Sequence, residues 1–187
     1  HSNRVTGIAI AIGKQMGCTT EEIGILNLAG QLHDIGKIGI PDDILLKPGR
    51  LTPEEFETIK GHSLIGASIV GQLGLWDREQ RIIRSHHERF DGTGYPDGLV
   101  GEQIPLLARI LSIADVYDAM ASDRTYRRRM AESRILEIIQ EGAGSQFDPA
   151  IVGVFMQLHR EGKIAGQEWE SAQYADGHPS PPLSLSA

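Results

Sequence analysis

Apolar residues recur every three or four positions along most of the chain, and this is the spacing of one face of an α-helix. The first such stripe consists of Val5, Ile8, Ile12 and Met16. Nearly every stretch outside the connections rich in glycine and proline follows the same pattern. The sequence therefore predicts an all-α fold, a bundle of about six to eight helices.

Capping signals indicate where several of these helices begin. Thr19-Thr20-Glu21-Glu22 and Thr52-Pro53-Glu54-Glu55 are capping boxes, in which the threonine oxygen accepts from an amide three residues on and the glutamate reaches back. Asp148 precedes the last helix as its cap. Together with the apolar spacing, these signals predict helices over residues 2–16, 20–33, 53–73, 77–87, 105–121, 132–141 and 149–161.

Three segments lie outside this helical pattern. Residues 38–51 form a connecting loop, and residues 90–101 form a long loop with four glycines, a kind of loop that is often functional in a compact domain. Residues 165–187 are polar and end in prolines and serines. We therefore divide the chain into a domain over 1–164 and a tail over 165–187, and expect Trp169 or Tyr174 to attach the tail to the body or to a neighbour.

Composition places the chain among ordinary globular proteins. It has 187 residues, 40% of them hydrophobic, with no signal-peptide pattern and no apolar run that could span a bilayer. The net charge of −7 argues against binding a nucleic-acid polymer but not against a small anionic ligand at a locally positive site. The single cysteine, Cys18, fits a reducing cytoplasm, where we place the protein. Because the chain opens on His1 and not on Met, we expect a fragment of a longer protein.

The candidate chemistry centres on His33-Asp34. Further histidines and an aspartate lie at or near the ends of predicted helices: His1, His62, His86, His87 and Asp115. Imidazole and carboxylate are donors for Fe, Mn, Zn, Ni and similar divalent ions. An aspartate has two oxygens, so Asp34 can bridge two ions while His33 binds one. A lone His-Asp pair means little, and it is the number of such donors that indicates a metal site.

The chain resembles the HD-GYP domains, a branch of the HD phosphohydrolase superfamily. The resemblance covers about residues 1–160. It rests on several spaced motifs: His33-Asp34-Ile35-Gly36-Lys37, His62, His86-His87-Glu88-Arg89-Phe90-Asp91-Gly92-Thr93-Gly94-Tyr95-Pro96, Asp115-Val116-Tyr117-Asp118-Ala119-Met120 and Asp123-Arg124-Thr125-Tyr126-Arg127. It implies an all-α HD-domain bundle in which residues 90–101 are the GYP loop, and it makes residues 1–164 the catalytic domain.

Carried over position by position, the resemblance implies seven metal ligands: His1, His33, Asp34, His62, His86, His87 and Asp115. It implies two divalent ions, or three where a further glutamate stands upstream of the first histidine, with Fe or Mn expected first. The sequence alone leaves the metal open, because imidazole and carboxylate suit several ions. For His1 the alternative is a frayed end or a remnant of a tag.

The resemblance also assigns two residues beside the metals. Lys37 would contact the scissile phosphate; the alternative is a solvated lysine at the end of a helix, near its negative dipole. Asp118 would hydrogen-bond the nucleophile or hold a metal-bound histidine, and the two roles stay open. With Asp34, these residues form the expected catalytic set.

Four further residues are expected at the substrate. Arg124 and Arg127 resemble the basic residues that grip the substrate phosphates, although the family commonly has proline at the position of Thr125. Tyr95, next to Pro96, would stack on a guanine. The alternatives for this loop are docking of a GGDEF-type diguanylate cyclase, or glycines that serve only tight turns.

The function that follows is hydrolysis of cyclic di-GMP to linear pGpG, GMP or both, by a hydroxide that bridges two metals. A bound divalent ion lowers the pKa of water from about 15.7 to about 7, so hydroxide is available at neutral pH. The alternatives are a phosphodiesterase for another cyclic dinucleotide and a weakly catalytic module that binds a cyclic dinucleotide or a GGDEF protein. The resemblance also implies an upstream sensor or receiver domain. A homodimer stays open, and we expect no membrane contact from this domain.

Overall fold

Helices form nearly all the regular structure in the computed structural model, which describes residues 1–72, 74, 76–122 and 129–164. In chain order they are α1 (Ser2–Gln15), α2 (Thr20–Leu32), the 3-10 helix η1 (Ile35–Gly39), α3 (Asp42–Leu45), α4 (Pro53–Lys60), α5 (His62–Gln72), α6 (Asp77–Ser85), the 3-10 helix η2 (Gly101–Gln103), α7 (Leu106–Ala121), α8 (Glu132–Glu141) and α9 (Pro149–Arg160). Over these described ranges no β-strand occurs and the extended pairing is limited to isolated β-bridges, so the predicted all-α fold is confirmed.

The predicted start of each long helix agrees with the structure to within one residue, and both capping boxes form. The single helix predicted over 53–73 is wrong, because it divides into α4 and α5 at Gly61. There the amide of Gly61 bonds to the carbonyl of Thr58, three residues earlier, which tightens the turn. His62 therefore opens α5 and does not lie mid-helix. The predicted loop over 38–51 also contains the single turn α3.

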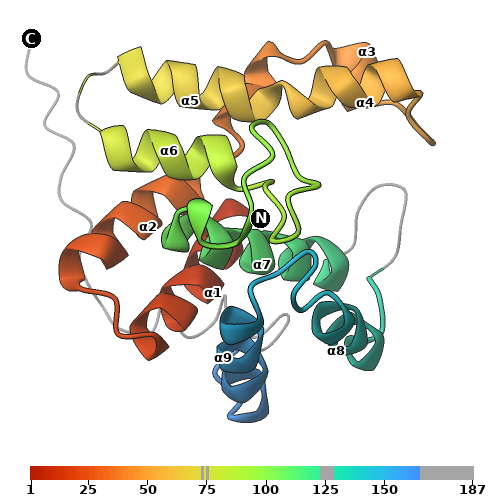
Figure 1. Ribbon diagram of the computed structural model, residues 1–187. Coiled ribbons are helices and arrows are strands. Elements are labelled where there is room, and N and C mark those ends of the chain that lie inside the picture. Colours follow the sequence, from red (N-terminus) through yellow and green to blue (C-terminus); the bar gives the residue numbers. More distant parts are fainter. Residues whose placement is uncertain (73, 75, 123–128, 165–187) are drawn as a thin grey trace, which may run out of the picture.

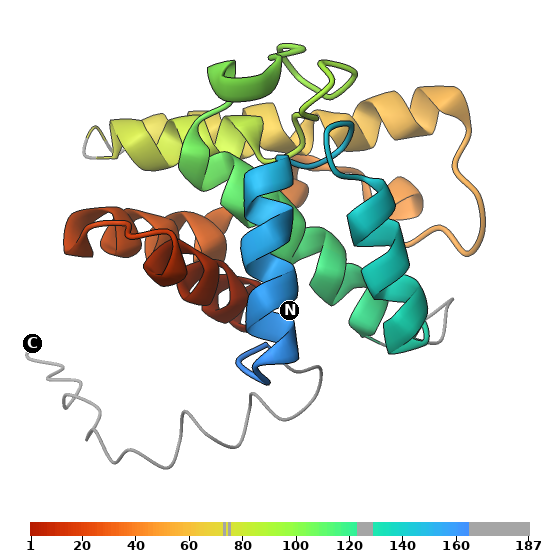
Figure 2. The same cartoon turned by 60° about the horizontal axis from the view of Figure 1, so that its bottom comes forward.

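The helices pack around α7. α1 contacts α2, α7 and α9, while α2 also contacts α6, and α6 packs on α5 (Figure 1). α8 and α9 cover the other side of α7, as the turned view shows (Figure 2). The predicted stripe on α1 is the reason for its place, because Val5, Ile8 and Ile12 are buried in the shared core. Among the described helices, none is both long enough and apolar enough to cross a membrane.

One close approach joins η1 to α5. A Cβ atom added at Gly36 would lie 1.9 Å from the carbonyl oxygen of His62 and 2.5 Å from the amide nitrogen of Gly66. No side chain fits there, so only glycine lets the backbone of η1 touch α5. This contact brings the segment that carries Asp34 against the helix that begins with His62.

Several predictions fall on residues that the structure does not describe. The tail over 165–187, with Trp169 and Tyr174, is one such segment. The division into residues 1–164 and 165–187 therefore stays a prediction. The last described residues still belong to the body, since Ile164 is 1% exposed in the hydrophobic core.

Candidate metal centre

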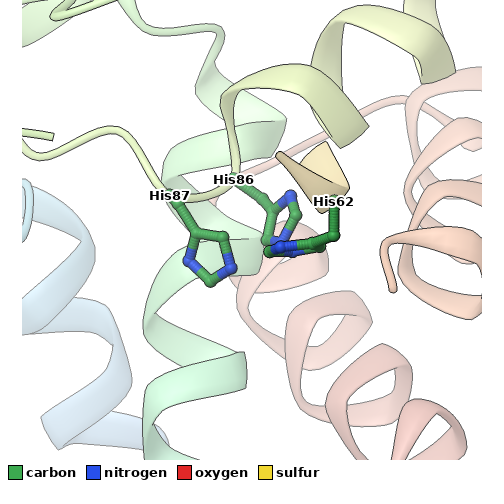
Figure 3. Close-up of side chains that lie close together, drawn as sticks. All are labelled: His62, His86 and His87. Atoms are coloured by element: carbon green, nitrogen blue, oxygen red, sulfur yellow. The ribbon is translucent and has the colours of Figure 1, made fainter. Parts of the chain in front are cut away.

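Three histidines form a first cluster, here called the triple-histidine cluster. His62 comes from the first residue of α5, and His86 and His87 follow the end of α6. Their rings point toward one another (Figure 3). One ligand nitrogen from each lies within 4.8 Å of the other two, and the Nε2 atoms of His62 and His86 are 3.4 Å apart. His62 and His86 are almost completely buried.

A second cluster combines His1, His33 and Asp115, from the start of α1, the end of α2 and the middle of α7. The Oδ1 atom of Asp115 lies 3.2 Å from Nε2 of His1 and 3.8 Å from Nε2 of His33. Three segments far apart in the sequence thus supply one nitrogen or oxygen each. We call this group the His-Asp cluster.

Asp34 lies between the two clusters. Its Oδ1 atom is 3.6 Å from Nε2 of His62, in the triple-histidine cluster. Its Oδ2 atom is 3.6 Å from Nε2 of His33 and 3.8 Å from Nε2 of His1, in the His-Asp cluster. The two oxygens of one carboxylate therefore face different clusters, which is the arrangement that a bridging ligand requires.

The buried histidines are oriented by their own backbone. The Nδ1 atoms of His33, His62 and His86 each lie 2.7 Å from the carbonyl oxygen of the residue three positions earlier: Gly30, Ile59 and Ile83. A carbonyl only accepts, so the proton is on Nδ1 and the lone pair is on Nε2. Metal-binding histidines are commonly fixed in this way. All three rings thus present Nε2 to the space between the clusters.

The donor set fits divalent ions. Two ligand atoms about 2.1 Å from one ion lie roughly 3.0 to 4.2 Å apart, depending on the angle between them. The spacings of 3.2 to 3.8 Å found here fall in that range. In addition, Nε2 of His33 is buried without a hydrogen-bond partner among the described residues. A buried lone pair of this kind is costly unless something binds it.

Protonation states agree with ligand roles. Burial lowers the pKa of His62, lowers that of His86 well below its usual value, and lowers that of His87 to about 3. These imidazoles are neutral at pH 7, with lone pairs available. Burial raises the pKa of Asp34, whereas the positive charge of Lys37 and its hydrogen bond lower it; the pKa is below the ordinary value, so the carboxylate is ionised.

His1 is held by a chain of polar contacts. Its Nδ1 atom donates to Oδ2 of Asp118 at 2.7 Å, and Oδ1 of Asp118 accepts from Nε of Arg4, also at 2.7 Å. Hydrogen bonds with Asp115 and Asp118 raise the pKa of His1 to about 9. His1 is therefore protonated on both ring nitrogens at neutral pH, and a metal ion bound at Nε2 must displace the proton there. Two roles were left open for Asp118, and its hydrogen bond to His1 agrees with the second, in which it holds a metal-binding histidine.

Two residues of the expected substrate site lie at the edge of the clusters. The ammonium of Lys37 is 2.5 Å from Oδ2 of Asp34, so it lies beside the metal centre. Tyr95 packs on His87, with ring centroids 5.0 Å apart, and Pro96 follows it in the loop. Burial, and then the charges of Asp115 and Asp34, raise the pKa of the Tyr95 hydroxyl.

A buried carboxylate shapes the GYP loop. Glu88 is 3% exposed and accepts hydrogen bonds from the amides of Asp97, at 2.7 Å, and Leu99, at 3.1 Å. Gly94 passes so close to this residue that an added Cβ would lie 2.6 Å from the Cα of Glu88. The loop thus folds around Glu88, and this places Tyr95 against His87.

Comparison with known proteins agrees with this geometry. A family model described as HD domain matches residues 1–151, which include every residue of both clusters and Asp34.

The chain belongs to the HD-domain family.

The match to the HD-domain family confirms the resemblance, and curated relatives agree with it. A probable cyclic di-GMP phosphodiesterase of Vibrio cholerae serotype O1 is 46% identical over 136 residues, or 68% of this chain and 31% of the relative. A 3'3'-cGAMP-specific phosphodiesterase of the same organism is 36% identical, over 80% of this chain and 32% of the relative. The HD domain thus spans about a third of the length of these curated relatives.

A solved structure supports the fold. An HDGYP protein from Bdellovibrio bacteriovorus superposes with a TM-score of 0.70 at 22% identity, over 86% of this chain and 51% of that one. At this level of identity the likeness shows a shared fold.

All seven expected ligands of this HD domain come together, as do Lys37 and Tyr95. Arg124 and Arg127 lie outside the described residues, so their role stays a prediction. Two residues with contacts here had no predicted role: Arg4, and Glu88, which is present only as a member of one of the motifs quoted for the resemblance. A glutamate just before the glycine-rich loop was the available signal for Glu88, whereas the contact of Arg4 with Asp118 depends on the packing of α1 on α7.

Proposed function

We propose that this HD domain is a metal-dependent phosphodiesterase that hydrolyses cyclic di-GMP to pGpG, GMP or both. The observation that carries the proposal is the position of Asp34, whose two oxygens face two separate groups of ligand atoms. Two divalent ions bridged by a carboxylate form a clamp for phosphodiester hydrolysis. The names of the curated relatives support the same reaction class.

The ligands of the two ions follow from the clusters. His62, His86 and His87 would hold one ion, while His1, His33 and Asp115 would hold the other, with Asp34 shared between them. Bound divalent ions would supply a water of lowered pKa as the nucleophile and would neutralise phosphate charge. Fe or Mn suits these nitrogen and oxygen donors, and a third ion would need a ligand upstream of His1.

The remaining residues of the site act on the substrate. The Lys37 ammonium, beside Asp34, is placed to attract a phosphate oxygen and to stabilise the charge that develops there. Asp118 keeps His1 in one tautomer and orientation. Tyr95 offers a ring for a guanine, and Arg124 and Arg127 would add positive charge at the phosphates.

Substrate choice within the cyclic dinucleotides is part of the proposal. Curated relatives carry names with cyclic di-GMP and with 3'3'-cGAMP, and the higher identity is to one of the former. We therefore place cyclic di-GMP first and the mixed dinucleotide second. Docking of a GGDEF protein on the GYP loop and an upstream sensor or receiver domain stay predictions.

Product analysis tests the function. The protein is loaded anaerobically with Mn(II) or Fe(II) and incubated with cyclic di-GMP, 3'3'-cGAMP and cyclic di-AMP, and the products are separated by chromatography. We expect pGpG or GMP from the wild type and none from the double variant His33→Ala/Asp34→Ala. Hydrolysis by that variant at the wild-type rate would defeat the proposal, and binding without turnover by the wild type would indicate a binding module.

A further inference from the structure

One face of α4 carries an exposed aromatic ring next to the metal centre. Phe56 and Lys60 are four residues apart on this helix, so their side chains are neighbours. Phe56 is 47% exposed, and none of the residues of α4 is buried in the core. Phe56 is therefore exposed to solvent and is not needed for the packing of the hydrophobic core.

Phe56 and Lys60 both contact Tyr95 of the GYP loop. The rings of Phe56 and Tyr95 meet edge to face, with centroids 6.5 Å apart and an interplanar angle of 83°. The ammonium of Lys60 lies 5.5 Å from the centroid of each ring. Figure 1 shows the GYP loop beside the junction of α4 and α5, where this contact forms.

These three side chains form a row that begins at the metal centre. Tyr95 packs on His87 at 5.0 Å, and Phe56 follows on the side of Tyr95 that faces α4. A phosphate held at the triple-histidine cluster would thus have two aromatic rings and one ammonium beside it. We call Phe56, Lys60 and Tyr95 the aromatic-lysine row.

The Lys60 ammonium is available to a ligand. Its ion-pair partner is Glu57, 2.5 Å away, and the side chain of Glu57 is 68% exposed. The Lys60 side chain is 25% exposed, and an ion pair with so exposed a partner as Glu57 contributes little to holding it in place. Since Lys60 lies over two rings, its position is fixed better than that of a lysine in open solvent.

We propose that the aromatic-lysine row is a guanine-recognition subsite, in which Phe56 stacks on a base, Tyr95 meets that base at its edge, and Lys60 donates hydrogen bonds to it. The inference rests on the proposed function and names the residues that set its substrate preference. Guanine presents two acceptors, O6 and N7, whereas adenine presents N7 beside an amino donor. An ammonium has donors only, so it favours guanine over adenine.

The test compares two base identities. Lys60→Met removes the donor and the charge, while Lys60→Arg keeps both and offers two donors to O6 and N7. Loss of the charge alone would lower kcat/KM equally for cyclic di-GMP and cyclic di-AMP. The ratio of the two kcat/KM values therefore isolates the contribution of base recognition. We expect Lys60→Met to lower this ratio on the order of tenfold and Lys60→Arg to retain it.

The ring is tested in the same way. Phe56→Ala should raise KM for cyclic di-GMP on the order of tenfold through lost stacking, with kcat little changed. Lys14→Met, at an exposed lysine of α1, is the matched control and should change neither value.

Three outcomes separate this inference from the proposed function. Wild-type values for Lys60→Met and Phe56→Ala, in a protein that hydrolyses cyclic di-GMP, would overturn the subsite and leave the function intact. If the wild type binds cyclic di-GMP in calorimetry but does not cleave it, weaker binding by both variants would support the subsite alone. A wild type that neither binds nor cleaves cyclic di-GMP would overturn both.

Discussion

Replacing Gly36 with alanine should separate the two halves of the metal centre. The added Cβ atom would lie 1.9 Å from the carbonyl oxygen of His62, a backbone atom that cannot rotate away. Real Cβ atoms essentially never approach closer than 3.0 Å, so η1 and α5 must move apart by about 1.1 Å. Forcing atoms into a packed interior in this way costs about 1–3 kcal/mol.

The same movement changes the ligand geometry. Oδ1 of Asp34 and Nε2 of His62 are 3.6 Å apart, and an added 1.1 Å would widen this to about 4.7 Å. Two ligands at about 2.1 Å from one ion can span at most about 4.2 Å. We therefore expect Gly36→Ala to lose the ion at the triple-histidine cluster and to keep the other.

Two assays check this, with a control from the same chain. Gly24 lies on the exposed face of α2, and an added Cβ meets nothing within 4 Å. Gly24→Ala should stabilise the helix by about 0.5–1 kcal/mol. Urea denaturation of the metal-free proteins measures the free energy of unfolding, and elemental analysis measures metal per chain. If Gly36→Ala matched Gly24→Ala in both, the reasoning would be refuted.

Five further changes test other parts of the structure. Asp34→Asn keeps the shape but loses a negative charge, so elemental analysis should find at least one ion fewer per chain; an unchanged metal content would rule out the bridging role. Glu88→Gln puts an NH2 donor where one of the two accepting carboxylate oxygens stands, opposite a loop amide, and urea denaturation should show a free energy of unfolding lower by about 1–3 kcal/mol, whereas an unchanged value would mean that the loop does not depend on the carboxylate. Thr52→Ala removes a capping box and should cost about 1 kcal/mol in the same assay, and so should Thr19→Ala; one cap without effect would indicate a frayed helix end. Removing metal with a chelator should lower the midpoint of thermal unfolding, because ions that bind only the folded state stabilise it by about 2.7 kcal/mol at 100 times their Kd; an unchanged midpoint would argue against tight ions.

The fold followed from local rules to a large extent. The stripe of Val5, Ile8 and Ile12 determines which side of α1 is buried, and the Thr19 and Thr52 boxes fix where two helices begin. These are contacts within a few residues of sequence, and propensity and spacing describe them well. The break at Gly61 was missed because a glycine within a periodic segment does not by itself interrupt it.

The site was predictable as a set of residues and not as an arrangement. The motifs named His33, Asp34 and Asp115, and the structure brings them together. Which oxygen of Asp34 faces which cluster depends on the contact between Gly36 and α5, a tertiary approach that no local pattern encodes. The contact of Phe56 with Tyr95 was missed for the same reason, since it joins a helix to a loop about 40 residues away in the sequence.

Anomalous diffraction from crystals of anaerobically purified protein, recorded at the absorption edges of iron and manganese, tests the metal centre most directly. We expect two peaks about 3.5–4 Å apart, one on each side of Asp34, one within bonding distance of His62, His86 and His87 and the other near His1, His33 and Asp115. A single peak, or ions bound away from these side chains, would contradict the bridged pair and the phosphodiesterase proposed from it.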